Sequence, residues 1–138
     1  MRKRTQAREY ALQMLYEIDI TQDPLKEVIE NFWQSQSEEN ISKEVKEFAE
    51  FLTKGVIDNL NQINSLISQY SQNWDIKRMA VVDRNILRLA SFEILFCQDI
   101  PPKVSINEAI ELAKRFSSQE SAKFVNGILD KIKEKANR

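Results

Sequence analysis

The sequence of 138 residues contains no histidine, one cysteine, two glycines and three prolines. Without histidine the chain lacks the commonest general base and a main metal ligand. The single Cys97 can form neither an internal disulfide nor a zinc site, and two isolated glycines cannot build a phosphate-binding loop. So few glycines and prolines also disfavour a turn-rich β fold. We therefore predict that the protein is not an enzyme and has no catalytic residue, cofactor or metal.

Long hydrophobic runs are also missing. Nothing approaches the roughly 20 apolar residues that span a bilayer, and Gln13, Glu17 and Asp19 interrupt the stretch that follows the basic start. A lone cysteine fits a reducing compartment, so we expect a cytoplasmic protein without membrane contact. With 42% hydrophobic and 30% charged residues, the composition is that of a globular protein. The length predicts one domain over residues 1–138.

Apolar residues recur with helical spacing along most of the chain. The first helical stripe comprises Ala7, Tyr10, Ala11, Met14, Leu15 and Ile18. Residues 76–97 are apolar on most sides, which predicts a central buried helix. We expect an N-cap at Asp23 with Pro24 as the first helical residue, capping boxes at 105–108 and 117–120, and a break near Gly55 or the asparagines of 59–64. The fold class is therefore all-α, with about seven helices in one bundle-like domain.

Positive charge gathers at both ends. The first eight residues carry Arg2, Lys3, Arg4 and Arg8 and no carboxylate, although the whole chain has a formal charge of −1. The last eight, "KIKEKANR", contain four basic residues and one acidic residue. This asymmetry favours a polyanionic partner. The alternative is that the basic ends serve only solubility.

Glu93 lies in the apolar segment "LASFEILF" and is expected to be partly buried. It pairs either with Arg84 or with Arg88, or else it has a raised pKa and acts as an acid; we favour the structural pair. Cys97 falls on an apolar face and is expected to be a buried thiol rather than a nucleophile.

Two positions in the final predicted helix allow two interpretations each. Gly127 costs about 1 kcal/mol relative to alanine inside a helix, so we expect close approach there of another helix or of a ligand. Phe124 fits an apolar core stripe, but Lys123 beside it also suits a ring that stacks on unpaired RNA bases.

Three segments resemble one known family. They are "AREYALQMLYEID" near the start, "RMAVVDRNILRLASFEI" in the middle and "IPPKVSINEAIELAKRFSSQESAKFVNGILDKI" at the end. In this order they are similar to the NusB family of transcription antitermination factors. The resemblance implies two packed helical bundles. It also implies binding to the single-stranded boxA element of ribosomal RNA leader RNA, together with the ribosomal protein NusE, within an RNA polymerase antitermination complex.

The resemblance also implies residue roles. The implied RNA contacts are Arg2, Lys3, Arg4, Arg8, Glu120, Lys123 and Phe124. The implied NusE-facing residues are Tyr16, Asp83 and Arg88. Thr5 and Gln6 depart from the family pattern, which has more basic residues there. We expect the basic N-terminus and Phe124 to form one continuous RNA groove, with four cations that contact phosphates.

Two alternatives stay open. The chain is an accessory module for ribosomal RNA modification, although it carries no cofactor-binding motif, or it is a helical protein–protein adaptor without an RNA role. A homodimer formed through an apolar helix face is open as well.

Overall fold

The computed structural model describes residues 2–72 and 74–136, and within these it contains seven α-helices and one short 3₁₀ helix. The prediction of an all-α fold with about seven helices is confirmed. The N-terminal bundle consists of α1 (Lys3–Thr21), α2 (Leu25–Ser35) and α3 (Lys43–Asp58). The C-terminal bundle consists of α4 (Leu60–Tyr70), η1 (Ile76–Arg78), α5 (Val81–Phe96), α6 (Pro102–Phe116) and α7 (Gln119–Ala136).

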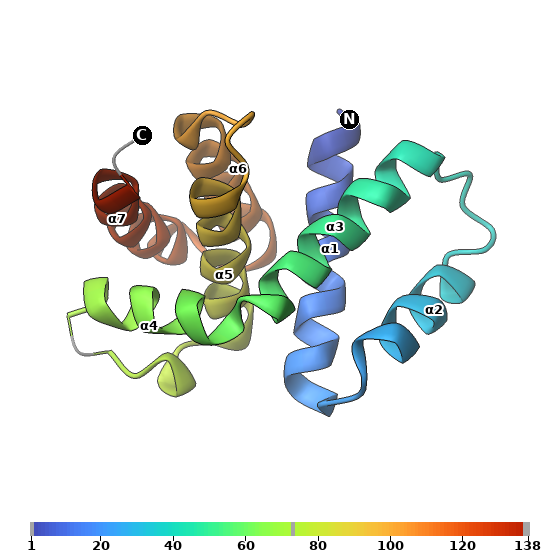
Figure 1. Cartoon of the computed structure of the whole chain (residues 1–138), viewed down its shortest axis with the longest axis horizontal. Helices are drawn as coiled ribbons and strands as arrows, with labels where there is room; N and C mark the ends of the chain where they lie inside the picture. Colours follow the sequence, from blue (N-terminus) through green and yellow to red (C-terminus); the bar gives the residue numbers. More distant parts are fainter. Residues whose placement is uncertain (1, 73, 137–138) are drawn as a thin grey trace.

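Helix α5 occupies the centre of the molecule, as its apolar sequence predicts. It packs against α1, α3, α4, α6 and α7, and it stands between α1 and α7 in Figure 1. Ten consecutive residues of α5, from Asn85 to Ile94, are buried. The larger hydrophobic core surrounds this helix, while a smaller cluster lies between α1, α2 and α3. Helix α1 begins and α7 ends on opposite sides of α5 (Figure 1).

The structure contains the predicted helices, but several of them begin at a different capping residue than expected. Helix α2 begins at Leu25 with Pro24 as its N-cap residue, one position later than expected. Helix α6 begins at Pro102, because the fixed φ of proline suits a first helical turn, so 105–108 is not a capping box. The box predicted at 117–120 is displaced by one residue: the cap of α7 is Ser118, whose hydroxyl accepts a hydrogen bond from the Ser121 N–H at 3.0 Å. The chain divides at Asn59, within the predicted stretch.

The two glycines differ in their surroundings. At Gly55, inside α3, an added Cβ would lie 2.1 Å from Cζ of Phe92, so the ring of Phe92 rests directly on the α3 backbone. At Gly127 an added Cβ would meet no heavy atom of the described part of the chain within 4 Å. The prediction that a neighbouring helix packs closely against Gly127 is therefore wrong. Ligand approach at Gly127 stays a prediction.

Candidate nucleic-acid interface

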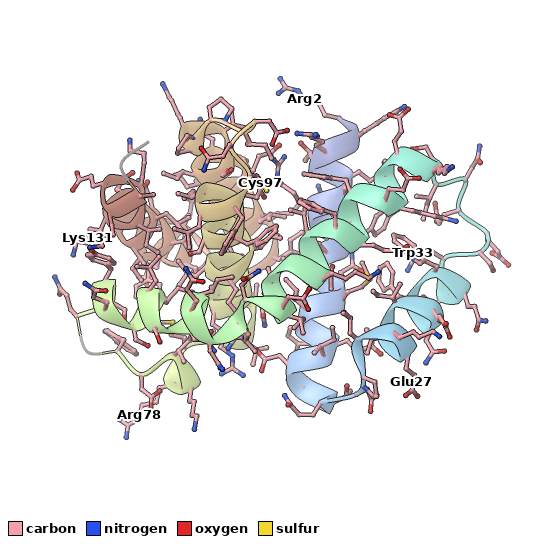
Figure 2. All side chains as sticks on the ribbon, in the orientation of Figure 1. Arg2, Glu27, Trp33, Arg78, Cys97 and Lys131 are labelled. Carbon is pink, nitrogen blue, oxygen red and sulfur yellow. The ribbon has the colours of Figure 1, made fainter. Side chains whose placement is uncertain are left out.

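Three of the four predicted N-terminal cations are exposed at the start of α1. Arg2 precedes the helix and is labelled at the upper edge in Figure 2. Lys3 forms an exposed ion pair with Glu44 of α3 at 3.2 Å. The Arg4 guanidinium lies 4.4 Å from the ring centroid of Phe48 and 3.7 Å from a carboxylate oxygen of Asp99. Exposed ion pairs contribute about 0–1 kcal/mol, so these cations can exchange their carboxylates for phosphates at little cost.

Arg8 is buried, and the expectation that it contacts phosphate is corrected. Its side chain is 3% exposed and donates from Nε and Nη2 to the two oxygens of Glu93, at 2.9 and 2.7 Å. A third hydrogen bond runs from Nη1 to Glu108 at 3.1 Å. Burial opposes the charge on Arg8, but the hydrogen bond and charge of Glu93 outweigh it and raise the pKa of the guanidinium. Arg8 therefore joins α1 to α5 and α6.

The same contacts answer the question of Glu93. It is buried, as expected, but its partner is Arg8 and not Arg84 or Arg88. The Ser105 hydroxyl also donates to Glu93 at 2.9 Å, and the Thr5 hydroxyl donates to Glu108 at 2.6 Å. A carboxylate held by a bidentate arginine is a structural group, so this cluster offers no free acid.

Phe124 lies half-buried on α7 beside Trp74, with ring centroids 6.2 Å apart in an edge-to-face arrangement. The two rings line a surface pocket with Arg78 and Asp83. The pocket also includes Glu120, whereas Lys123 is exposed on the next turn. An aromatic pair beside a cation is an arrangement on which a base can stack. Trp74 and Arg78 were missed in the sequence because neither follows a helical stripe.

The basic N-terminus and the Phe124 pocket lie at opposite ends of α5. Arg4 contacts Asp99, which follows the C-terminal end of α5, whereas Phe124 shares its pocket with Ala80 and Asp83 at the N-terminal end. The 16 residues of α5 span roughly 24 Å at 1.5 Å per residue. Figure 2 shows Arg2 and Arg78 at opposite edges of the molecule. The predicted continuous groove is therefore wrong, and the candidate RNA residues form two separate clusters.

The predicted NusE-facing residues have unlike surroundings. Tyr16 is exposed on α1. Asp83 accepts a hydrogen bond from Ser121 at 3.0 Å through Oδ2, while its buried Oδ1 has no hydrogen-bond partner among the described residues. Arg88 is buried and donates to Asp19 at 2.8 Å and to Asn64 at 2.9 Å. The expectation that Arg88 faces a partner is corrected, because its guanidinium is committed inside the molecule.

Asp19 on α1 holds two arginines of α5. It accepts two hydrogen bonds from Arg84, at 2.7 and 2.8 Å, one from Arg88 and one from Asn85. Burial alone would raise the pKa of Asp19, but these donors and charges outweigh it and lower the pKa. Burial in turn lowers the pKa of Arg88.

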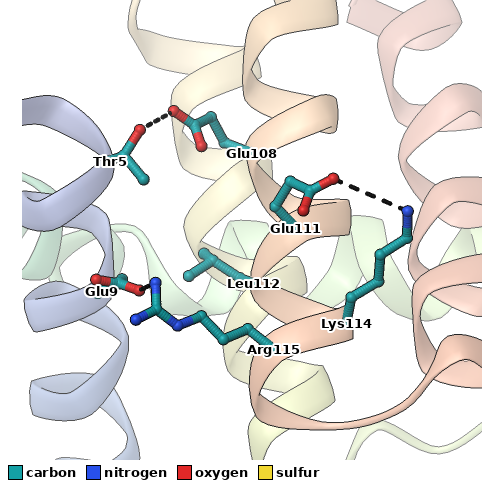
Figure 3. A pocket seen from close by; sticks show the side chains of 7 residues that line it. All are labelled: Thr5, Glu9, Glu108, Glu111, Leu112, Lys114 and Arg115. Carbon is teal, nitrogen blue, oxygen red and sulfur yellow. Dashed lines mark hydrogen bonds and ion pairs between the residues drawn. The ribbon is translucent and has the colours of Figure 1, made fainter. Parts of the chain in front are cut away.

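A further pocket opens between α1 and α6 (Figure 3). Glu9 and Arg115 form an ion pair across it, and Glu111 pairs with Lys114 along α6 at 3.8 Å. Opposite charges alternate around this pocket, so it presents no field of one sign to an anionic ligand. Over the described ranges, no group of three or more histidine, cysteine, aspartate or glutamate side chains is arranged to hold a metal ion. None of the helices described is long and apolar enough to cross a membrane.

Comparison with known proteins reveals the family. Residues 5–134 match the model of the NusB family. The transcription antitermination protein NusB of Thermodesulfovibrio yellowstonii is 46% identical over 138 residues, covering 94% of this chain and 91% of that protein. The solved structure of T. maritima NusB superposes with a TM-score of 0.86 at 40% identity, covering 95% of this chain and 90% of that one.

A second solved structure contains the antitermination factors NusB and NusE in complex with dsRNA. It matches with a TM-score of 0.86 at 30% identity and covers 98% of both chains. A family model that spans nearly the whole sequence, together with relatives of this identity, leaves one conclusion. This chain belongs to the NusB family.

Proposed function

We propose that this protein is a cytoplasmic transcription antitermination factor that binds the boxA element of ribosomal RNA leader RNA together with NusE. The resulting complex joins RNA polymerase and promotes processive transcription of ribosomal RNA genes. Residues 1–138 act as one RNA-binding unit, of which Met1, Asn73, Asn137 and Arg138 lie outside the described residues.

The observation that carries the proposal is the likeness to the solved NusB–NusE–dsRNA complex over 98% of the chain. Two features of this chain support it. Arg2, Lys3 and Arg4 are exposed at one edge, where they can reach phosphates. Phe124 and Lys123 lie at the other end of α5, where a splayed base can stack. Tyr16 and Asp83 are the residues that we propose for contact with NusE.

The direct test is a gel shift with boxA RNA and a scrambled RNA of the same composition, each with and without NusE. We expect boxA to bind more tightly than the scrambled RNA, and NusE to increase that difference. Equal binding of the two RNAs in both conditions would contradict boxA recognition. It would favour the adaptor or the RNA-modification accessory module.

A salt titration measures the phosphate contacts. Four cations predict a log–log slope of roughly −3, at about 0.7 for each phosphate on single-stranded RNA. Because Arg8 is buried, three cations remain and the expected slope is about −2. A slope near zero would exclude an electrostatic role for the N-terminus. Light scattering of the free protein in the same buffer distinguishes a monomer from a homodimer, the question that the sequence leaves open.

The substitution Phe124→Ala tests the second cluster. Loss of one base–aromatic stack, about 1–3 kcal/mol, weakens boxA binding roughly 5- to 150-fold. Because the ring is only half-buried, the variant keeps its helical circular dichroism and loses less stability than a core truncation, which costs about 3–5 kcal/mol. A loss of stability of that size with unchanged RNA affinity would assign Phe124 to the core.

A further inference from the structure

Four phenylalanines form a continuous row across α3 and α5, here called the ring row: Phe48, Phe51, Phe92 and Phe96. The ring centroids of Phe48 and Phe51 lie 6.2 Å apart, those of Phe51 and Phe92 lie 5.6 Å apart, and those of Phe92 and Phe96 lie 5.4 Å apart. The first and last of these pairs are stacked, and the middle pair is edge-to-face.

The middle of the row is fixed and its two flanks are open. Phe92 is 3% exposed and rests on the α3 backbone at Gly55, where no larger residue fits without moving the ring. On either side of it, Phe51 is 50% exposed and Phe96 is 40% exposed. A buried ring therefore holds two exposed rings in set positions, which is the geometry of a preformed stacking platform.

Lys3 and Arg4 place positive charge at the Phe48 end of the ring row. The Arg4 guanidinium lies over the ring of Phe48 and also pairs with Asp99, three residues beyond Phe96. Lys3 and Arg4 line a pocket with Phe48, Phe51 and two exposed carboxylates, Glu44 and Glu47, of which Glu47 pairs with Lys43. The carboxylates that hold these two cations, on Glu44 and Asp99, have side chains 75% and 70% exposed. Such pairs contribute little, so phosphates can replace them.

Exposed rings beside displaceable cations suit single-stranded nucleic acid. Each nucleotide carries a base that can stack on an aromatic ring and a phosphate that can pair with a cation. The Arg4 cation lies over Phe48, the end ring of the row, so the charge that would hold a phosphate adjoins the rings.

We propose that the exposed rings of Phe51 and Phe96 stack unpaired bases of the bound RNA, while Lys3 and Arg4 hold the adjoining phosphates. This inference rests on the proposed RNA-binding function and adds a stacking surface, distinct from Phe124, at the basic edge. The RNA thus has a base-binding element at each end of α5.

The test uses boxA RNA and the full chain, with Phe51→Leu and Phe96→Leu as variants. Leucine keeps apolar bulk but cannot stack, so each variant binds boxA roughly 5- to 150-fold more weakly while its melting temperature stays close to that of the wild type. Phe116→Leu is the matched control, because Phe116 is 41% exposed on α6 and outside the row. Its affinity for boxA is expected to be unchanged.

Photocrosslinking gives a readout that needs no variant. With 5-iodouridine placed along boxA, mass spectrometry of the wild-type complex is expected to find adducts on Phe51 or Phe96. If the wild type binds boxA, normal affinity of both leucine variants and no adduct in the row would overturn the inference and leave the proposed function intact. Unchanged RNA affinity with weaker NusE binding or self-association would overturn it in favour of a protein interface. A wild type that does not bind boxA refutes the proposed function itself.

Discussion

Two polar clusters join α1 to α5, and their charges are reversed. In the Arg8 cluster, one arginine of α1 meets two carboxylates, Glu93 and Glu108. In the Asp19 cluster, one carboxylate of α1 meets Arg84 and Arg88. The side chains of Arg8 and Glu93 are 3% and 1% exposed, whereas those of Asp19, Arg84 and Arg88 are 11%, 15% and 10% exposed.

The reversed charges of the two clusters specify the direction of α1 relative to α5. Residue 8 meets residue 93 and residue 19 meets residues 84 and 88, so α1 and α5 run antiparallel. If α1 packed the other way round, Arg8 would face two arginines and Asp19 would face Glu93. Such buried like-charge contacts cost several kcal/mol. The two clusters therefore favour the observed orientation of α1 over the reversed one.

The largest expected effect on folding stability is at the Arg8 cluster, which is the more deeply buried of the two. Arg8→Met keeps the apolar length of the side chain but leaves Glu93 buried without its cation, which costs about 3–5 kcal/mol in the free energy of unfolding. Urea denaturation measures the loss. The double variant Arg8→Met/Glu93→Leu is expected to recover part of it, because no unpaired charge remains. A loss below about 1 kcal/mol in the single variant would show that water reaches Glu93.

A smaller effect is expected at Asp19. Asp19→Asn removes the charge that two arginines share but keeps an oxygen that accepts hydrogen bonds, and these groups are more exposed than Arg8. We expect a loss of about 1–3 kcal/mol by the same urea measurement. A loss greater than that of Arg8→Met would reverse the ranking of the two clusters.

Acid titration separates the clusters further. The pKa of Asp19 is lowered in the folded protein, because its hydrogen bonds and neighbouring arginines outweigh burial. Its stabilisation is therefore fully present above the unfolded aspartate pKa of about 3.9 and is lost as the pH falls through the lower folded pKa. The stability gap between wild type and Asp19→Asn is expected to narrow below about pH 4. A gap that stays constant between pH 7 and pH 3 would contradict this linkage.

The smallest effect on folding is expected at the exposed pair of Lys3 and Glu44. Lys3→Ala changes the free energy of unfolding by about 0–1 kcal/mol, because both side chains are well solvated. The same variant is expected to reduce the magnitude of the salt slope for RNA binding by about 0.7, by loss of one phosphate contact. Lys26→Ala on α2, an exposed lysine outside both candidate RNA clusters, serves as the matched control and should leave the slope unchanged.

The sequence alone predicted the helices, the central position of α5 and the burial of Glu93, because all three follow from local spacing. Spacing also contained a signal for Arg8, which stands three, four and seven residues before the buried Ala11, Leu12 and Leu15. The cluster of basic residues at the N-terminus favoured a phosphate contact for Arg8 instead. The partner of Arg8 could not be read from the sequence, since Glu93 lies 85 residues away.

The ring row was missed for a related reason. Its stacking depends on how closely α3 approaches α5, and Gly55 determines that approach through a contact with Phe92 that no local pattern contains. The division of the candidate RNA-binding residues into two clusters also depends on contacts between residues that are distant in the sequence. Arg4 and Phe124 are apart because they lie near opposite ends of α5, and this placement depends on the tertiary fold.

Helix α1 begins at the upper edge of the molecule with the exposed cations of the N-terminus, whereas α7 ends on the other side of α5 and α6 (Figure 1). An affinity tag fused ahead of α1 would sit beside the candidate phosphate contacts and obstruct nucleic acid sterically. Immobilisation through an engineered cysteine in place of the exposed Glu27 on α2, at the lower edge in Figure 2, would leave the basic edge open. The native Cys97, which is 4% exposed, would compete little for a thiol-directed linker.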